Sequence, residues 1–500
     1  MKLFTIGDSL SQGFMSGAGA RTDLCYSTMI ARSMGLRVGT DYVHPEWPAG
    51  GHPIDLERVL RRLQSELGRD VRGLSNWAHA ARVINRLLDD VEDYYEHGPG
   101  AAHRPYPGGV DHFDNVASWG YTVADAWQVT PRLCLEEIAK NRFGDTFGDL
   151  NPFPSAGFYR TALSVLNPTR DPVYDGFCAL DWLDWHATTR AGGGVENVLL
   201  WLGANNILGA VLRLVVDSTD RARGAFKDKS HQDKRKYNVW KPEHFREEYA
   251  ELLDRVDDIM QRNVSPDWDV FVGTVPSVTI PPVTKAMGNP RVVADPHLVL
   301  RDGARYFDRY VLVFLSENPK VPALTFHEIY DLDHRISKYN EAIRELVAEK
   351  NEAHRSRSGR DRYHIVEIGK ALLEAAYKRN DGDPPYKFPK EIKQLQPRPD
   401  TRYYRCVRGE GKVCEGGIFS LDGVHPTAIG QGLVAHEFRK TMAEAGVDFA
   451  HPLDWTMVTA SDQLWQKPLP LVEGLFDHEK LASWAFTLQR WFANRGLNAD

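Results

Sequence analysis

Residues near the two ends of the chain have the types and spacing needed for nucleophilic hydrolysis. Ser9 stands in the run Gly7-Asp8-Ser9-Leu10, directly after a short apolar segment. Near the other end, Asp422-Gly423-Val424-His425 puts a carboxylate and an imidazole on one turn. A serine hydroxyl needs a base to take its proton, and that base needs a carboxylate to fix its tautomer and stabilise its cation. We therefore expect Ser9, His425 and Asp422 to form a catalytic triad.

Two further segments offer donors for an oxyanion. The apolar run 198–202 leads into Gly203-Ala204-Asn205-Asn206, and an asparagine amide just beyond a strand can donate to developing negative charge. The segment 115–125 contains Gly120, where the missing side chain lets a substrate approach the backbone. Taken alone, each segment also fits an ordinary turn that closes a buried strand.

A third segment, Asn76-Trp77-Ala78-His79-Ala80-Ala81, loosely resembles the Gly120 segment. It has no glycine, and it continues into an amphipathic helical pattern formed by Val83, Leu87 and Val91. We therefore expect Gly120 to supply the donor and the earlier segment to serve packing.

The elements that must position these residues form an alternating pattern, because short β-branched or apolar runs are separated by helical stretches. The runs are 2–6, 113–117, 198–202, 270–274 and 363–368. One helix is clear, since Ile336, Tyr339 and Ile343 lie on one stripe. This alternation predicts an α/β fold with a parallel sheet and helices on both faces.

Long gaps between the runs predict one catalytic domain, residues 1–450, with large insertions rather than several domains. The insertions fall near 36–110, 131–190 and 371–418, and they far exceed ordinary strand–helix connections. Residues 451–500 form a tail whose Leu481, Trp484, Leu488 and Trp491 share one helical face. We expect this helix to dock on the body, with a hydrophobic cover over a substrate or a dimer surface as the alternative.

The four motif segments, in this order, resemble the blocks of the SGNH (GDSL) hydrolases, a family of serine esterases and lipases. The matching residues are Gly7-Asp8-Ser9-Leu10, Asn115 with Gly120, Gly203-x-Asn205, and Asp422-x-x-His425. Asn206 departs from the family, which more often has an acidic residue at that position.

The resemblance implies a flavodoxin-like three-layer α/β/α sandwich with a central five-stranded parallel sheet. It implies an oxyanion hole built from the Ser9 and Gly120 N–H groups and the Asn205 side chain. It also implies hydrolysis of small-molecule or lipid esters through an acyl-enzyme, with no metal and no cofactor. An acyltransferase or carbohydrate deacetylase on the same scaffold stays open, as does a binding module that has kept the fold and lost catalysis.

The amino-acid composition and net charge limit the classes of partner that we expect the protein to bind. The 500 residues include 61 basic and 68 acidic side chains, and a net charge of −7 gives no broad attraction to nucleic acid or anionic membranes. No window reaches the roughly 18 to 20 apolar residues of a membrane span. The Ser9 motif follows Met1 too closely for a signal peptide, so the chain as written is expected to be cytoplasmic, or secreted if a leader has been removed. These motifs carry no information on oligomeric state.

Cysteine and histidine spacing gives no sign of a metal or a disulfide framework. The five cysteines are sparse and lack Cys-x-x-Cys spacing, so we expect reduced thiols, with Cys406 and Cys414 alone close enough for a local bridge. His79, His97, His103 and His112 do not fall at metal-ligand spacings with carboxylates or cysteines. The basic runs 227–236 and 354–362 are typical of solvated loops.

Overall fold

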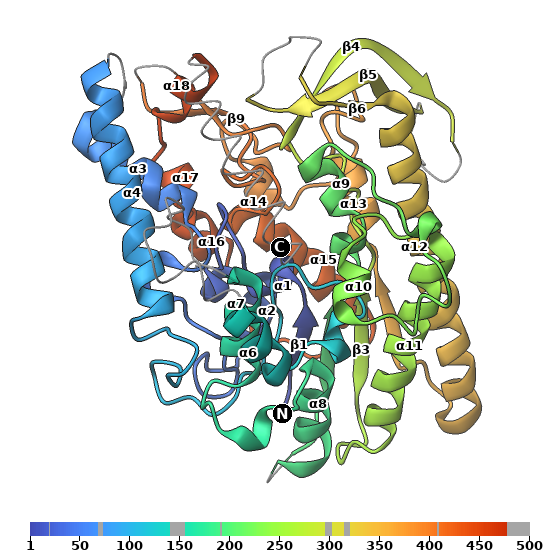
Figure 1. The fold of residues 1–500 in the computed structure, drawn as a ribbon. Coiled ribbons are helices and arrows are strands. Elements are labelled where there is room, and N and C mark those ends of the chain that lie inside the picture. Colours follow the sequence, from blue (N-terminus) through green and yellow to red (C-terminus); the bar gives the residue numbers. More distant parts are fainter. Residues whose placement is uncertain are drawn as a thin grey trace.

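The computed structural model describes residues 1–19, 21–68, 74–140, 156–190, 193–295, 303–314, 321–407 and 410–477. Its centre is a parallel sheet of four strands in the order β1-β2-β3-β7 (Figure 1). These strands are β1 (Phe4–Gly7), β2 (Asn197–Trp201), β3 (Asp269–Gly273) and β7 (Tyr363–Val366). Every residue of β1, β2 and β3 is buried, as expected for a parallel sheet covered on both faces.

A further segment runs beside the other edge of β1. The Thr5 amide donates to the Asp114 carbonyl (2.9 Å), the Val116 amide to the Thr5 carbonyl (3.0 Å) and the Ser118 amide to the Gly7 carbonyl (3.2 Å). Thr5 and Asn115 form an isolated parallel bridge. Four of the five predicted runs are therefore strands of the sheet, and the run 113–117 is hydrogen-bonded to β1 without forming an extended strand.

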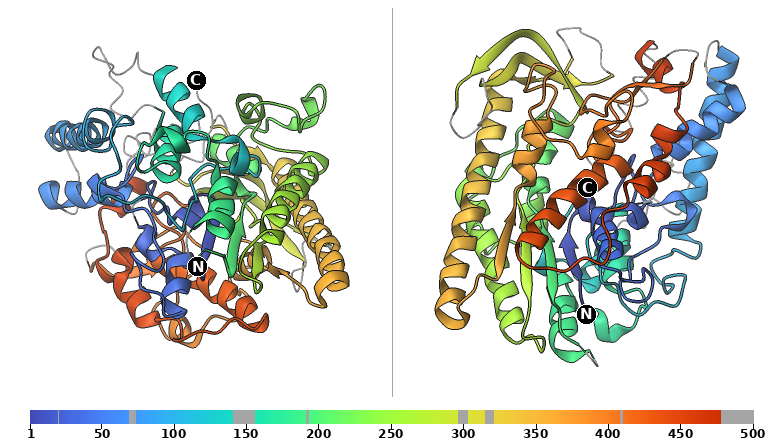
Figure 2. Two further views of the ribbon diagram at one scale, coloured as in Figure 1. Left: turned by 90° about the horizontal axis from the view of Figure 1, so that it is seen from below. Right: turned by 180° about the vertical axis from the view of Figure 1, so that it is seen from behind.

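Helices cover the sheet on both sides (Figure 2). On one side, Val198 and Leu200 of β2 share a core with the long helices α11 (Pro242–Gln261) and α12 (Phe326–Ser358). On the other side, the alternate β2 residues Leu199 and Trp201 share a core with α2 (Tyr26–Ser33) and α15 (Ala428–Glu444). Because successive strand side chains point to opposite faces, one apolar strand supplies both cores.

The predicted insertions carry helices of their own. The region 36–110 contains α3 (Leu56–Leu67) and α4 (Leu74–Glu96). The region 131–190 contains α6 (Pro131–Lys140), α7 (Gly157–Leu166) and α8 (Ala179–Asp184), followed by a π-helical turn, Trp185–Thr189. The remaining short elements are α1 (Ser9–Gln12), α5 (Asp125–Gln128), α9 (Leu208–Arg213), α10 (His231–Arg235), α13 (Ile368–Ala375), α14 (Lys390–Lys393), β8 (Arg405–Cys406) and β9 (Val413–Glu415).

The sequence pattern did not predict a second, antiparallel sheet. It consists of β4 (Thr284–Val293), β5 (Ala304–Leu312) and β6 (Leu324–Thr325) and lies above α12 in Figure 1. Most of β4 is exposed or half-buried, and its pairing with β5 shifts register between Met287 and Pro290. A strand that is mostly exposed and broken by a bulge lacks the alternating apolar pattern by which strands are recognised in a sequence.

The prediction that the two basic runs are solvated loops is wrong for Lys234 and Arg235 in the first run and for His354 in the second. Lys234 forms a buried ion pair with Glu248 (2.5 Å), and the Arg235 guanidinium lies 4.0 Å from the centre of the Phe158 ring. In the second run, buried His354 bonds Asp257 at 2.6 Å. Each of these buried side chains has a carboxylate or aromatic partner on another helix, which composition within the run cannot reveal.

The described part of the C-terminal tail packs on the body. It contains α16 (Trp455–Ser461), α17 (Gln463–Gln466) and α18 (Val472–Asp477), and Trp455 is buried in the same core as α15. The predicted Leu481, Trp484, Leu488 and Trp491 stripe lies outside the described residues.

All five cysteines are free thiols, as predicted. None of the helices described combines the length and apolar character of a membrane span.

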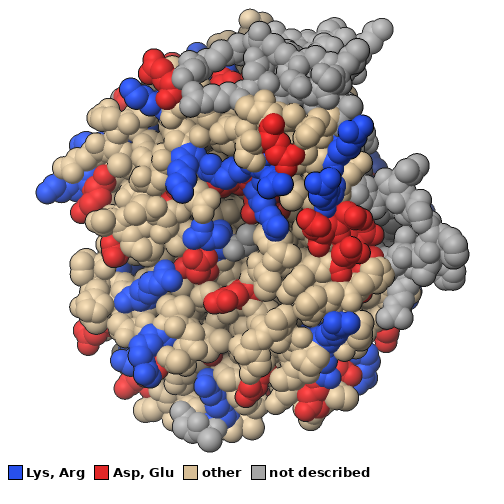
Figure 3. Space-filling view, turned by 90° about the vertical axis from the view of Figure 1, so that its left-hand side faces the viewer, with Lys and Arg blue, Asp and Glu red and all other residues tan. Residues whose placement is uncertain are grey.

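The face that carries α3 and α4 mixes charges of both signs. Figure 3 shows lysine and arginine side chains beside aspartate and glutamate over the part of this face that the structure describes. Several of them pair along α3, including Arg61 with Glu57 (2.7 Å) and Arg62 with Glu66 (2.5 Å).

Candidate active site

Ser9 lies at the turn between strand β1 and the short helix α1. Asp8 caps this helix, because its carboxylate accepts a hydrogen bond from the Leu10 amide (3.0 Å). The helix ends at Gly13, whose backbone is left-handed (φ 78°) and whose missing Cβ would lie 2.7 Å from the Arg21 carbonyl oxygen. This tight turn holds the Ser9 side chain at the carboxyl edge of the sheet, where open α/β folds bind ligands.

The structure brings the three predicted triad residues into one hydrogen-bonded chain. His425 Nε2 lies 2.9 Å from Ser9 Oγ. On the other side of the ring, His425 Nδ1 lies 2.7 Å from Asp422 Oδ2. The Phe14 ring packs against the imidazole at a centroid distance of 4.5 Å. The arrangement can pass a proton from a nucleophilic hydroxyl to an oriented base.

The Asp422 carboxylate accepts hydrogen bonds from several backbone amides in addition to its contact with the His425 ring. Its Oδ1 accepts from the Val424 and His425 amides, both at 2.9 Å. Its Oδ2 accepts from the Gly17 amide at 2.8 Å. Burial alone would raise the pKa of Asp422, but the charge of His425 and these hydrogen bonds outweigh burial and lower the pKa below its usual range. Asp422 is therefore ionised when it faces the imidazole, which stabilises a protonated His425.

Asn205 lies beside the nucleophile and lines the same pocket as Ser9 and His425. Its Nδ2 donates to the Tyr121 carbonyl (3.0 Å) and to Asp8 Oδ2 (3.3 Å). Asp8 is fully buried, and burial raises its pKa to about 7 against the lowering effects of the Leu10 amide and His425. The amide that we predicted as an oxyanion donor is thus oriented by the residue preceding the nucleophile.

The Gly120 loop is tied directly to the nucleophile turn. The Trp119 amide donates to Gln12 Oε1 at 2.7 Å, and Gly120 itself has a left-handed backbone (φ 77°). Next in the chain, the Tyr121 carbonyl accepts the Asn205 amide described above. The roles of the Gly120 and Ser9 N–H groups as oxyanion donors stay predictions.

The neighbouring loop depends on Asn206 rather than on an acidic residue. Asn206 Oδ1 accepts from the Val123 amide at 3.2 Å, and its side chain is fully buried. The alternative Asn76–Ala81 segment lies within α4, where Ala80 packs in an apolar cluster with Val83 and Leu88. This agrees with the expectation that it serves packing.

An almost entirely apolar pocket opens beside Ser9 and His425. It encloses about 100 Å³. Its far wall comes from Ile368, Leu372 and Ala375 of α13 and from Leu433 of α15. Tyr386 and Glu437 also line it and are hydrogen-bonded to each other at 2.6 Å. The pocket can take a small or slender apolar group next to the reactive hydroxyl.

Sequence reasoning missed several groups that hold this site. Gly17, Gln12 and Phe14 contribute through their backbone, amide and ring, and they follow Ser9 closely in the chain. Their position close to Ser9 in the chain could have drawn attention to them. Glycine, glutamine and phenylalanine are not residue types that by themselves indicate a catalytic role.

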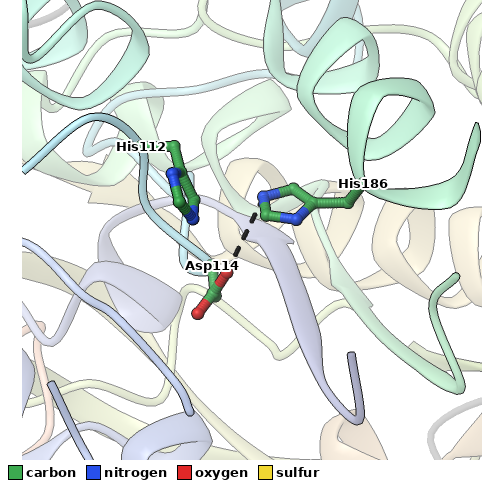
Figure 4. Close-up of side chains that lie close together, drawn as sticks. All are labelled: His112, Asp114 and His186. Atoms are coloured by element: carbon green, nitrogen blue, oxygen red, sulfur yellow. Dashed lines mark ion pairs between the residues drawn. The ribbon is translucent and has the colours of Figure 1, made fainter. Parts of the chain in front are cut away.

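One group of side chains bears on the prediction that the histidines do not form a metal site. His112 lacks ligand spacing in the sequence, yet His112, Asp114 and His186 each offer a donor atom within 4.8 Å of the others (Figure 4). The third residue comes from the distant turn after α8, so no local spacing could have shown it.

No protein-family model matches the chain, and no curated protein matches it.

Proposed function

We propose that this protein is a serine hydrolase of the SGNH (GDSL) type that cleaves carboxylic esters through an acyl-enzyme. The observation that carries the proposal is the unbroken hydrogen-bonded chain from Ser9 Oγ through His425 to Asp422, beside an apolar pocket. Structural histidines are common. A histidine that is hydrogen-bonded to a serine hydroxyl on one side and to a fixed carboxylate on the other has the geometry of a base that activates a serine nucleophile.

The sheet supports the same class. If the segment beside β1 is counted as a strand, the parallel strands follow the chain order 2-1-3-4-5, which is the order of flavodoxin-like folds. In that order the nucleophile follows the first strand, and the asparagine follows the third at the same sheet edge. We propose this flavodoxin-like arrangement for the chain.

In the proposed mechanism, His425 takes the Ser9 proton as the hydroxyl oxygen attacks the ester carbonyl. Asp422 stabilises the imidazolium that forms. Asn205 and the Ser9 and Gly120 amides donate to the oxyanion of the tetrahedral intermediate. His425 then protonates the departing alcohol, and a water molecule, activated by the same imidazole, hydrolyses the acyl-enzyme.

The pocket favours an ester whose acyl part is short and apolar. About 100 Å³ is below the size of a pocket that buries a drug-sized ligand. A sugar acetate also carries a short apolar acyl group, so carbohydrate deacetylation stays the alternative. Adding an alcohol to the ester substrates would distinguish transfer of the acyl group to an alcohol from hydrolysis by water.

The test is covalent labelling combined with a substrate panel. A fluorophosphonate probe should label the wild type at Ser9, and Ser9→Ala should lose both labelling and ester hydrolysis. Ser11→Ala is the matched control, because Ser11 bonds Tyr26 inside the core rather than His425. p-Nitrophenyl esters from acetate to palmitate, with and without added alcohol, identify the acyl preference and separate hydrolysis from transfer. Labelling retained in Ser9→Ala would refute the proposal.

A further inference from the structure

A second histidine–aspartate cluster lies near the start of β1, away from Ser9. His112 and Asp114 belong to the segment beside this strand and stand two residues apart. His186 approaches them from the π-helical turn Trp185–Thr189. Turns of this type occur frequently at functional sites. Figure 4 shows the three side chains facing one another.

Several nitrogen and oxygen atoms of this cluster that could bind a metal lack hydrogen-bond partners. His186 Nε2 and Asp114 Oδ1 are buried, lie 3.7 Å apart and make no hydrogen bond of good geometry, although the Phe113 carbonyl lies near the His186 ring. The two ring nitrogens of His112 make none either. His186 is 0% exposed and Asp114 is 1% exposed. Buried polar atoms are nearly always paired, so several unpaired atoms around one point need an explanation.

A metal ion would satisfy these atoms. Two ligands that each lie about 2.0 to 2.1 Å from Zn²⁺ are separated by about 3.3 Å or more, so a 3.7 Å gap is close to what a bridging ion needs. The other carboxylate oxygen, Asp114 Oδ2, is held by the Val43 amide at 2.7 Å, which leaves Oδ1 facing the gap. The aromatic rings of Phe4 and Trp185 pack around the histidines and form an apolar shell.

We propose that His112, Asp114 and His186 bind a divalent transition-metal ion, with Zn²⁺ the best match. Two imidazoles and one carboxylate are a usual zinc donor set, with a water molecule in the fourth position. The ion would link the segment beside β1 to the turn after α8. Its role is distinct from ester hydrolysis, because the cluster contains no residue of the triad.

Arg190 competes with the ion. Its Nη1 lies 3.3 Å from His186 Nδ1 and 3.7 Å from Asp114 Oδ1. When Nε2 binds a metal, Nδ1 carries the proton, so two N–H donors would then face each other. The Arg190 side chain is 33% exposed and can turn to solvent. Arg190→Gln should therefore bind Zn²⁺ more tightly than the wild type, by about tenfold.

The experiment uses the whole chain after dialysis against a chelator. Isothermal titration with Zn²⁺ should give one ion per chain, and Zn²⁺ should raise the melting temperature. His112→Asn and His186→Asn should each weaken binding by at least about tenfold, the scale of losses even for partners behind the ligands. His103→Asn is the control, since this exposed histidine lies on the same connection outside the cluster.

X-ray absorption of the zinc-loaded wild type tests the ligands without any variant. The proposal expects nitrogen and oxygen neighbours at about 2.0 to 2.1 Å with imidazole scattering. Sulfur neighbours at about 2.3 Å would place the ion on a cysteine such as half-buried Cys414 and overturn it. Absence of stoichiometric binding, or unchanged affinity in a folded His112→Asn protein, would also overturn it.

Discussion

Two histidine–aspartate pairs lie at opposite ends of strand β1 and differ in how completely they are hydrogen-bonded. At the carboxyl end, His425 contacts Asp422 at 2.7 Å and Ser9 at 2.9 Å, and both carboxylate oxygens accept further amides. At the amino end, His186 and Asp114 stand 3.7 Å apart with unpaired atoms between them. The same residue types thus occur in one closed and one open arrangement.

The difference separates two kinds of chemistry. A pair with direct hydrogen bonds can hold an imidazole in one tautomer and transfer a proton along its axis. A pair held just beyond hydrogen-bond length leaves room for an ion between its donor atoms. A buried third pair, His231 and Asp125 at 2.8 Å, also has a hydrogen bond on its other side, to Tyr159, and has no serine partner. A histidine–aspartate hydrogen bond alone therefore does not identify a catalytic base. The partner of the second ring nitrogen, a serine at His425 and a tyrosine at His231, also has to be considered.

The largest expected effect comes from breaking the closed pair. His425→Ala should lower kcat/KM for a short p-nitrophenyl ester by roughly 10⁶-fold, because the general base is lost. Asp422→Asn should retain more activity, with a loss of about 10⁴-fold, because an amide still partly orients the imidazole. His112→Asn is the control from the open cluster and should leave this rate unchanged. Full activity in either triad variant would reject the triad.

Removing an oxyanion donor should have a smaller effect. Asn205→Ala should lower kcat by ~10² to 10³-fold, because the proposed mechanism then loses one of its oxyanion donors. Asn206→Ala provides the comparison, because Asn206 Oδ1 only supports the Val123 amide. That variant should lose about 1 to 3 kcal/mol of stability and little turnover. Equal kcat losses in both variants would mean that the loop as a whole, rather than the Asn205 amide, is responsible.

Much of the fold was predictable because its signals are local. The strands at Phe4–Gly7, Asn197–Trp201, Asp269–Gly273 and Tyr363–Val366 appear as apolar runs, since a strand covered on both faces has few polar positions. The β4–β5 hairpin carries no such signal, because exposed positions dominate β4. The buried Lys234–Glu248 pair was also hidden, because its energy comes from a partner on another helix.

The candidate site divides along the same line. Ser9 and Asn205 stand in short motifs at strand ends, and Asp422 and His425 stand in a short motif before a helix, so residue type and spacing sufficed to nominate them. Gly17 could not be nominated, because it acts through a backbone amide that any residue has. His186 could not be joined to Asp114, because only the folded chain brings the turn after α8 against the segment beside β1.

Asp8 gives a prediction on stability that depends on pH. Its pKa rises from 3.8 to about 7 on folding, so ionisation opposes folding. The penalty is absent below the unfolded pKa, grows as the pH rises towards 7, and is complete above it. Three pKa units correspond to about 4 kcal/mol. Asp8→Asn should therefore gain stability relative to the wild type by up to that amount between about pH 4 and pH 8, measured by urea unfolding. A pH-independent difference between the two proteins would contradict the assignment.

The smallest expected effect concerns the apolar wall of the closed site. Leu372 of α13 lines the pocket beside Ser9 and is half-buried, so its truncation should enlarge the cavity at little cost in stability. Leu372→Ala should raise the ratio of kcat/KM for hexanoate over acetate by roughly tenfold, because longer acyl chains gain apolar contact where the leucine stood. Leu373→Ala is the matched control, since this neighbour on the same helix does not line the pocket. If both variants shift the ratio equally, α13 moves as a unit and the acyl chain does not bind against Leu372. If neither shifts it, the acyl group lies elsewhere and the pocket holds the alcohol part of the ester.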